Sequence, residues 1–199
     1  MKMPSNAWQK PGLFILSLLP LVYLVVTVFA DWLGANPIEA LTRSLGDWAL
    51  RFLLVTLAIT PLRLFSGWSG WVRFRRMLGL FSFLYACLHL SSYIVLDQFF
   101  AWDEIWADII KRPYITFGMS AFLLLVPLAV TSTKGWIRRL GRNWQRLHWL
   151  VYPAAIGAVV HFYLMVKADI REPLIYGAIL AILLGTRLPP IRSAIQRMH

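Results

Sequence analysis

The chain has 199 residues, of which 59% are hydrophobic and only 15% are charged. Soluble domains usually contain about 45–50% apolar and about 25% charged residues, so this composition argues against a soluble globule, a disordered chain and a coiled coil. The formal net charge is +11. In so apolar a chain an excess of Lys and Arg is typical of the cytoplasmic loops of a membrane protein, and we expect no nucleic-acid partner. The single cysteine, Cys87, excludes an intrachain disulfide and a cysteine cluster for zinc or iron–sulfur binding.

Six apolar stretches follow one another along the chain, each about long enough to cross a bilayer as a helix. They cover residues 12–30, 48–65, 77–96, 114–131, 148–166 and 173–188. The second stretch is the weakest because it contains Arg51 and Arg63, although both lie near its ends, where their side chains can reach the interfaces. The two longest connections, residues 31–47 and 97–113, are too short to form a domain. We therefore predict an all-α fold, a polytopic membrane helical bundle of six transmembrane helices surrounded by lipid, with residues 1–199 as a single domain.

The first apolar stretch resembles the core of a signal peptide, because Lys2 and Lys10 precede it. Signal-peptide cores usually run for 7–15 residues, and this stretch is longer. We therefore expect it to be retained as the first transmembrane helix.

The charged residues divide the connections into a basic side and an acidic side. The basic side comprises the N-terminus, the second and fourth connections and the C-terminus, and it contains no acidic residue. Its positive residues are Lys2, Lys10, Arg63, Arg73, Arg75, Arg76, Lys134, Arg138, Arg139, Arg142, Arg146, Arg187, Arg192 and Arg197. Because Lys and Arg concentrate in cytoplasmic loops, we expect this side, and with it both termini, to be cytoplasmic.

Two of the four histidines fall at matching depths in different spans; His199 ends the chain and is given no role. His89 lies 12 residues, or about 18 Å, beyond the cytoplasmic start of the third span. His161 lies 13 residues, or about 20 Å, beyond the start of the fifth span, which runs in the same direction. Both imidazoles are therefore expected in the outer half of the bilayer, where two neutral imidazoles on facing helices can bind a haem iron from both sides.

The alternative is a purely structural role, in which each of these histidines only hydrogen-bonds to a neighbouring helix. Ionisable residues at membrane depth are nevertheless functional candidates, and the depth match favours haem ligation. A zinc site, a di-iron site and a proton relay are less favoured, because no carboxylate lies within a predicted span.

His148 lies at the cytoplasmic end of the fifth span, beside Arg142 and Arg146. At about 100° per residue, it is about 140° around the helix from His161. The third span has no histidine at the depth of His148, so a second bis-histidine haem is not expected. His148 could bind a second haem with an unusual partner such as Met77, contact a flavin or quinone head group, or cap a helix at the interface.

Two arginines on the outer side, Arg51 and Arg112, have two candidate sets of partners. They could bind haem propionates, or they could pair with the nearby carboxylates of Asp47 and Asp108. The guanidinium group suits both, because it binds carboxylates in a bidentate geometry.

Short segments along most of the chain, from about residue 34 onward, resemble the MsrQ (formerly YedZ) family. This family comprises haem-binding membrane subunits of the periplasmic methionine sulfoxide reductase system, within the ferric-reductase-like transmembrane group. The segments appear in the family's order and are specific together rather than singly. They are Ile59-Thr60-Pro61, Arg75-Arg76-Met77-Leu78-Gly79-Leu80, Leu88-His89-Leu90-Ser91-Ser92-Tyr93, Arg112-Pro113-Tyr114-Ile115-Thr116, Thr131-Ser132-Thr133, Gln145-Arg146-Leu147-His148 and Leu174-Ile175-Tyr176.

The resemblance implies a b-type haem with His89 and His161 as the axial pair and His148 as a third functional histidine. It also implies electron transfer across the bacterial inner membrane, from the quinone pool or a cytoplasmic flavin reductase to the periplasmic molybdopterin enzyme MsrP. That partner reduces methionine sulfoxide in oxidised periplasmic proteins. The family is also described as binding FMN, although the chain shows no flavin motif. The chain lacks the paired histidines per helix of eukaryotic ferric reductases and NADPH oxidases, which argues against two haems in series. It also lacks their cytosolic FAD and NADPH domains, so we expect the reductant to come from another molecule.

Two other functions compete with this interpretation. The chain could be a non-redox polytopic protein, such as a transporter or an assembly factor, whose histidines only pack. It could also be a self-contained ferric or quinone reductase without a protein partner. A haem absorption band in the purified protein would exclude the non-redox alternative. Co-purification with a periplasmic molybdoenzyme would exclude the self-contained reductase.

The charge distribution generates a test of topology. We expect a C-terminal alkaline phosphatase fusion to be inactive and a C-terminal fluorescent-protein fusion to be bright, because the positive-inside rule puts the C-terminus in the cytoplasm. Activity and fluorescence in whole cells measure this. The reverse pattern would contradict the six-span count.

Overall fold

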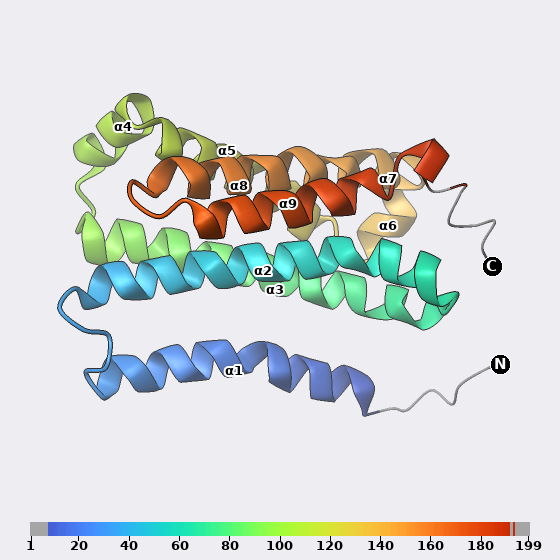
Figure 1. Ribbon diagram of the computed structural model, residues 1–199, viewed down its shortest axis with the longest axis horizontal. Helices are drawn as coiled ribbons and strands as arrows, with labels where there is room; N and C mark the ends of the chain where they lie inside the picture. The colour runs from blue at the N-terminus through green and yellow to red at the C-terminus, as the bar shows by residue number, and fades with distance from the viewer. Residues whose placement is uncertain (1–7, 192, 194–199) are drawn as a thin grey trace.

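The computed structural model describes residues 8–191 and 193, and over these residues the chain is helical without any β-strand (Figure 1). This confirms the all-α fold class. The α-helices are α1 (Gln9–Phe29), α2 (Pro37–Ser66), α3 (Val72–Ser92), α4 (Trp102–Lys111), α5 (Pro113–Val130), α6 (Lys134–Leu140), α7 (Arg142–Leu147), α8 (Val151–Met165) and α9 (Arg171–Gly185). The short helical segments are η1 (Ser69–Trp71), η2 (Tyr93–Asp97, a π-helix) and η3 (His148–Leu150). Lys2, Arg192, Arg197 and His199 lie outside the described residues.

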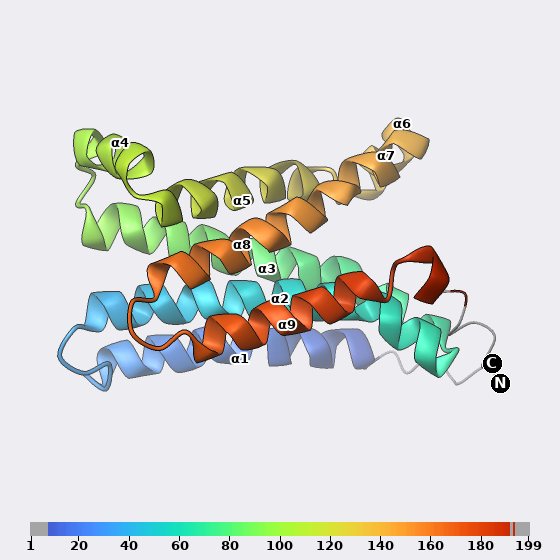
Figure 2. The ribbon, with the colours of Figure 1, turned by 45° about the horizontal axis from the view of Figure 1, so that its top comes forward.

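The long helices lie side by side and alternate in direction, so connections gather at the two ends of a bundle (Figures 1 and 2). α2 packs along α3, and α5 packs along α8, more extensively than any other two helices. The two pairs meet through contacts of α3 with α5 and of α2 with α8, while α9 lies against α2 and α8. α4 lies at one end of the bundle, and α6 and α7 lie at the other (Figure 2).

Five helical segments of the described chain are long and apolar enough to cross a membrane. They are Gln9–Phe29, Pro37–Ser66, Ser69–Asp97, Pro113–Val130 and Arg142–Met165, which correspond to the first five predicted spans. The sixth predicted span, residues 173–188, falls on α9. That helix has 15 residues and extends about 22 Å, less than the hydrocarbon thickness of about 30 Å. The alternating direction of α9 is consistent with six spans, and the count stays a prediction.

Large apolar side chains are exposed on the long helices, among them Phe14 of α1, Leu123 of α5 and Ile182 of α9. Soluble monomers rarely expose apolar surface of this extent. A hydrocarbon environment suits this surface, because the apolar side chains can face lipid while most backbone hydrogen bonds are made within the helices.

The first of the two long connections is mostly helical. α2 begins at Pro37, so residues 37–47 of this predicted connection are helical. The Asn36 side chain accepts a hydrogen bond from the backbone N–H of Glu39, and proline fits the first turn because that turn needs no N–H donor. The first turns of α2 contain charged residues, so their mean hydropathy is too low to predict a membrane-spanning helix there. A helix of 30 residues extends about 45 Å, so its ends project beyond the hydrocarbon.

The second long connection, residues 97–113, contains the amphipathic helix α4. Trp102, Trp106 and Ile110 form an exposed stripe with a spacing of four residues, whereas Ile105 is buried. An apolar stripe rich in tryptophan is typical of a helix that lies in the plane of the membrane interface.

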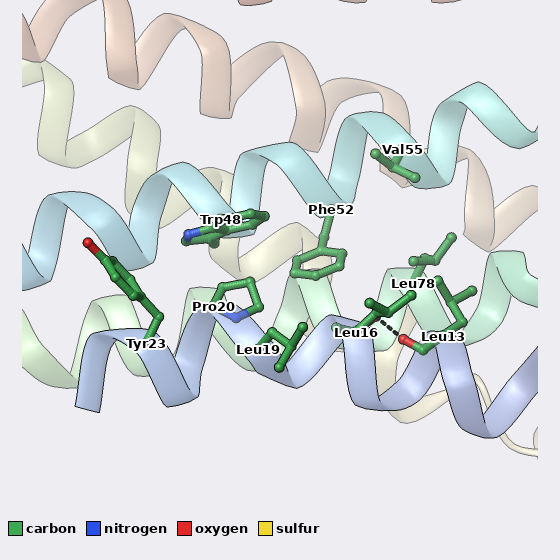
Figure 3. A pocket seen from close by; sticks show the side chains of 10 residues that line it. Leu13, Leu16, Leu19, Pro20, Tyr23, Trp48, Phe52, Val55 and Leu78 are labelled. Carbon is green, nitrogen blue, oxygen red and sulfur yellow. Dashed lines mark hydrogen bonds between the residues drawn. The ribbon is translucent and has the colours of Figure 1, made fainter. Parts of the chain in front are cut away.

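An apolar groove of about 480 Å³ separates part of α1 from the remaining bundle (Figure 3). Tyr23 of α1 and Trp48 and Phe52 of α2 line it. Next to the groove, the fully buried Tyr85 of α3 donates a 3.0 Å hydrogen bond from its hydroxyl to the backbone carbonyl of Ser17. This buried hydrogen bond fixes α1 to α3, while the groove leaves apolar surface for lipid chains.

An arginine after α9 completes the backbone hydrogen bonding of α2. Pro61 has no N–H to donate to the carbonyl of Leu57, four residues earlier. The Arg187 guanidinium instead donates to this carbonyl at 2.8 Å and to the carbonyl of Leu183 at 3.3 Å. Its Cζ also lies 5.2 Å from the centre of the Tyr152 ring. A single side chain therefore joins α2, α8 and α9.

We expect Arg187→Leu to lower the free energy of unfolding by about 1.5–3 kcal/mol, the usual contribution of a hydrogen bond to a charged group. In a Pro61→Ala background, residue 61 regains an N–H for the Leu57 carbonyl, so the same substitution should cost clearly less. Unfolding in detergent micelles, arranged as a double-mutant cycle, measures both values. Equal losses in the two backgrounds would show that Arg187 does not replace the donor missing at Pro61.

Candidate functional site

His89 of α3 and His161 of α8 lie next to one another. Their ring centroids are 6.1 Å apart and their planes are inclined by 73°. Both residues are partly buried near the ends of their helices, toward the end of the bundle where α4 lies (Figure 2). The equal depth that the sequence predicts thus corresponds to direct proximity of the two rings.

Each imidazole makes the same kind of hydrogen bond. The Nδ1 atom of His89 lies 2.8 Å from the backbone carbonyl oxygen of Thr42 in α2, and that of His161 lies 2.6 Å from the carbonyl oxygen of Tyr114 in α5. A carbonyl can only accept, so Nδ1 is the donor in both rings and carries the proton. In a neutral imidazole the other nitrogen, Nε2, then has a lone pair that can bind a metal.

Two imidazole nitrogens suit a haem better than a bare metal ion. Among the described residues no group of three or more His, Cys, Asp or Glu side chains could hold a metal by itself. A haem requires only axial ligands from the protein, because the porphyrin supplies the remaining nitrogens. An imidazole nitrogen lies about 1 Å from its ring centre and binds a metal at about 2 Å, so two axial rings place their centres about 6 Å apart. The distance of 6.1 Å fits this requirement.

A buried carboxylate organises the backbone beside His161. Asp108 of α4 accepts a 2.9 Å hydrogen bond from the Tyr93 hydroxyl and pairs with the Arg112 guanidinium at 2.9 Å. Arg112 also donates to the Tyr114 hydroxyl at 3.2 Å. Because the carbonyl of Tyr114 binds His161, this network connects α4 and η2 to the histidine pair.

The outer arginines pair with the protein carboxylates suggested by the sequence. Arg112 pairs with Asp108, and Arg51 lies 3.7 Å from Asp47. Arg51 also donates a 2.8 Å hydrogen bond to the Tyr176 hydroxyl, which joins α2 to α9. Both arginines therefore have partners within the fold.

His148 lies apart from the pair, in η3 near the end of the bundle where α6 and α7 lie. Its ring stacks on that of Trp144 with centroids 3.9 Å apart, and its Nε2 atom is 3.2 Å from the Thr131 hydroxyl. The Trp144 indole N–H donates to the Thr131 carbonyl at 2.9 Å. These contacts hold His148 against the C-terminal end of α5.

Comparison with known proteins identifies the family. Residues 45–159 match the family described as ferric reductase like transmembrane component. A protein of Rhodospirillum rubrum is named protein-methionine-sulfoxide reductase heme-binding subunit MsrQ. It is 62% identical to this chain over 180 residues, which cover 90% of this chain and 86% of the relative. The chain belongs to the MsrQ family.

Other members of the MsrQ family match over most of the chain. Relatives with the same name occur in Xanthomonas euvesicatoria pv. vesicatoria (57% identity, 80% of this chain and 73% of the relative) and in Xanthomonas oryzae pv. oryzae (57%, 79% and 72%). No solved structure matches the chain. The ferric-reductase-like match together with the long apolar helices makes this MsrQ family member a multi-pass membrane protein. That match includes His89 and His148, and it ends two residues before His161.

Two parts of the site in this MsrQ family member were missed at the level of sequence: the carbonyl groups of Thr42 and Tyr114. Every residue has a backbone carbonyl, so residue type gives no indication of this role. The sequence does contain one regularity that could have pointed to these carbonyls: Thr42 precedes His89, and Tyr114 precedes His161, by the same 47 residues.

Proposed function

We propose that this protein is a haem b electron-transfer subunit in which His89 and His161 are the axial ligands. The observation that carries the proposal is the pair of imidazoles 6.1 Å apart with both Nδ1 atoms bonded to backbone carbonyls. The name of the relatives, a heme-binding subunit, supports it. A haem bound there supplies a one-electron redox couple. The protein keeps both imidazoles neutral and oriented.

The position of the pair supports electron delivery to the outside. His89 and His161 lie toward the end of the bundle that carries Asp103, Glu104 and Asp108, away from the basic α6 and α7. By the positive-inside rule the acidic end faces the periplasm of an inner-membrane protein. We therefore propose a periplasmic molybdopterin enzyme, MsrP, as the electron acceptor. Its reduction of methionine sulfoxide would repair oxidised periplasmic proteins, a role supported by the name of the relatives.

We propose that electrons enter on the cytoplasmic side near His148, from the quinone pool or from a cytoplasmic flavin reductase. The contacts with Trp144 and Thr131 hold the His148 ring in place, and Arg142 and Arg146 of α7 supply positive charge nearby. An imidazole and guanidinium groups suit a quinone head group or the phosphate of FMN, because both ligands accept hydrogen bonds. A second haem bound by His148 is the competing assignment.

We expect His89→Ala and His161→Ala each to abolish the outer haem or to convert it from low spin to high spin, because either change leaves an axial position of the iron open. Absorption and EPR spectra of the purified proteins, normalised to polypeptide, measure this. His148→Ala is the matched control, because it removes an imidazole that lies apart from the His89 and His161 pair. It should leave the low-spin spectrum largely intact. Loss of all haem in His148→Ala, with retention in His161→Ala, would show that the axial pair is wrongly assigned.

Replacing His148 should affect one direction of electron flow. We expect His148→Ala to slow reduction of the outer haem by a quinol or a cytoplasmic flavin reductase, because the proposed entry site is changed. Reoxidation by the periplasmic partner should keep its rate. Stopped-flow absorbance of the two half-reactions measures both rates. Unchanged reduction with impaired reoxidation would exclude His148 from the entry side.

A further inference from the structure

The two histidines are held by matched sets of residues on matched helices. The sets are Thr42, Gly46 and His89 on α2 and α3, and Tyr114, Gly118 and His161 on α5 and α8. Each member of the second set lies 72 positions after its counterpart, at 42 and 114, 46 and 118, and 89 and 161. α2 and α5 run in one direction, and α3 and α8 run in the other (Figures 1 and 2). The two helix pairs therefore hold their histidines through the same set of contacts.

Each histidine ring occupies the space that a side chain at the glycine of its set would fill. A Cβ atom at Gly118 would lie 2.8 Å from Nδ1 and 3.0 Å from Cε1 of His161. A Cβ atom at Gly46 would lie 3.1 Å from both Cε1 and Nδ1 of His89. Contacts this short require the histidine ring to move, and the displacement required is larger at Gly118 than at Gly46.

The spacing of four residues explains why glycine occurs at these positions. In an α-helix the carbonyl of residue i points along the axis toward residue i+4, one turn further on the same face. A ring that reaches the Thr42 carbonyl from the neighbouring helix therefore passes over Gly46. The same relation holds for Tyr114 and Gly118. A β-carbon would push the ring away from the carbonyl and lengthen the hydrogen bond.

We propose that Gly46 and Gly118 are positioning residues that let His89 and His161 reach their backbone acceptors, and that they thereby set the basicity of both axial ligands. This inference rests on the proposed haem function. A hydrogen bond from the second ring nitrogen to a carbonyl raises the basicity of a metal-bound histidine. More basic ligands stabilise the oxidised iron, so the two hydrogen bonds hold the reduction potential low.

The test compares four glycine-to-alanine variants of the full chain, purified with haem. Gly118→Ala and Gly46→Ala place a methyl group against a histidine ring. Gly157→Ala is the packing control, because its Cβ atom would lie 3.3 Å from Cβ of Ala121 and its three nearest atoms belong to Ala121 and Phe117. Gly185→Ala is the open control, with no atom within 4 Å of its Cβ position.

The readouts are the EPR signal of the oxidised haem and its midpoint potential. We expect Gly118→Ala to raise the potential and alter the low-spin signal most, Gly46→Ala to do so less, and both controls to match the wild type. Wild-type values in both Gly118→Ala and Gly46→Ala would overturn the inference. An equal change in Gly157→Ala would also overturn it, because helix packing would then be the cause.

A second comparison covers the case in which Gly118→Ala does not fold. Adding His161→Gly removes the ring and hence the clash, so the double variant should accumulate as well as His161→Gly alone. Free imidazole, supplied with haem, should restore the low-spin signal of His161→Gly and should bind several-fold more weakly when Gly118→Ala is also present. A double variant that fails to accumulate, or that binds imidazole equally well, would overturn the inference.

The outcomes also separate this inference from the function on which it rests. Well-folded wild-type protein that binds no haem would overturn the proposed function, and the inference with it. Wild-type protein with low-spin haem, together with unaffected Gly46→Ala and Gly118→Ala variants, would overturn the positioning role alone.

Discussion

Two hydrogen bonds from imidazole nitrogens to backbone carbonyls determine the chemistry available to this protein. The bonds of His89 to Thr42 and of His161 to Tyr114 place the proton of each ring on Nδ1 and leave Nε2 to bind a metal. They require donor and acceptor helices to lie at close range, which the extensive α2–α3 and α5–α8 contacts provide. Without them the rings could adopt the other tautomer or turn toward other partners. The two most extensive helix contacts of the bundle are therefore also the ones that orient the candidate ligands.

The bundle separates two chemically different ends along its length. At the acidic end, the buried Asp108 joins Tyr93 and Arg112 beside the Tyr114 carbonyl, so the position of α4 is coupled to the histidine pair. At the basic end, His148 rests on Trp144 near the end of α5. The histidine pair and His148 therefore lie toward opposite ends of the bundle. This arrangement supports the proposed flow from a cytoplasmic or quinol donor to a periplasmic acceptor.

Much of this architecture could be predicted from the sequence, because hydropathy and charge act over whole segments. The helical fold, five of the spans and the proximity of His89 to His161 followed from apolar run lengths and from helix rise. The start of α2 was missed because Asn36, a local cap, begins a helix whose first turns are charged. α4 was missed because an interfacial helix buries only one face. The carbonyls of Thr42 and Tyr114 were missed because main-chain groups carry no residue signature. The spacing of 72 residues between the two histidine sets becomes informative once the packing shows which residues touch.

The EPR spectrum of the oxidised wild-type protein, purified with haem, tests most directly whether His89 and His161 bind one iron. A haem iron held by two axial imidazoles would give a low-spin signal. We predict such a signal, in an amount that accounts for the haem at this site. Folded protein that remains colourless, or that shows only high-spin ferric haem, would contradict the assignment of the two histidines as an axial pair.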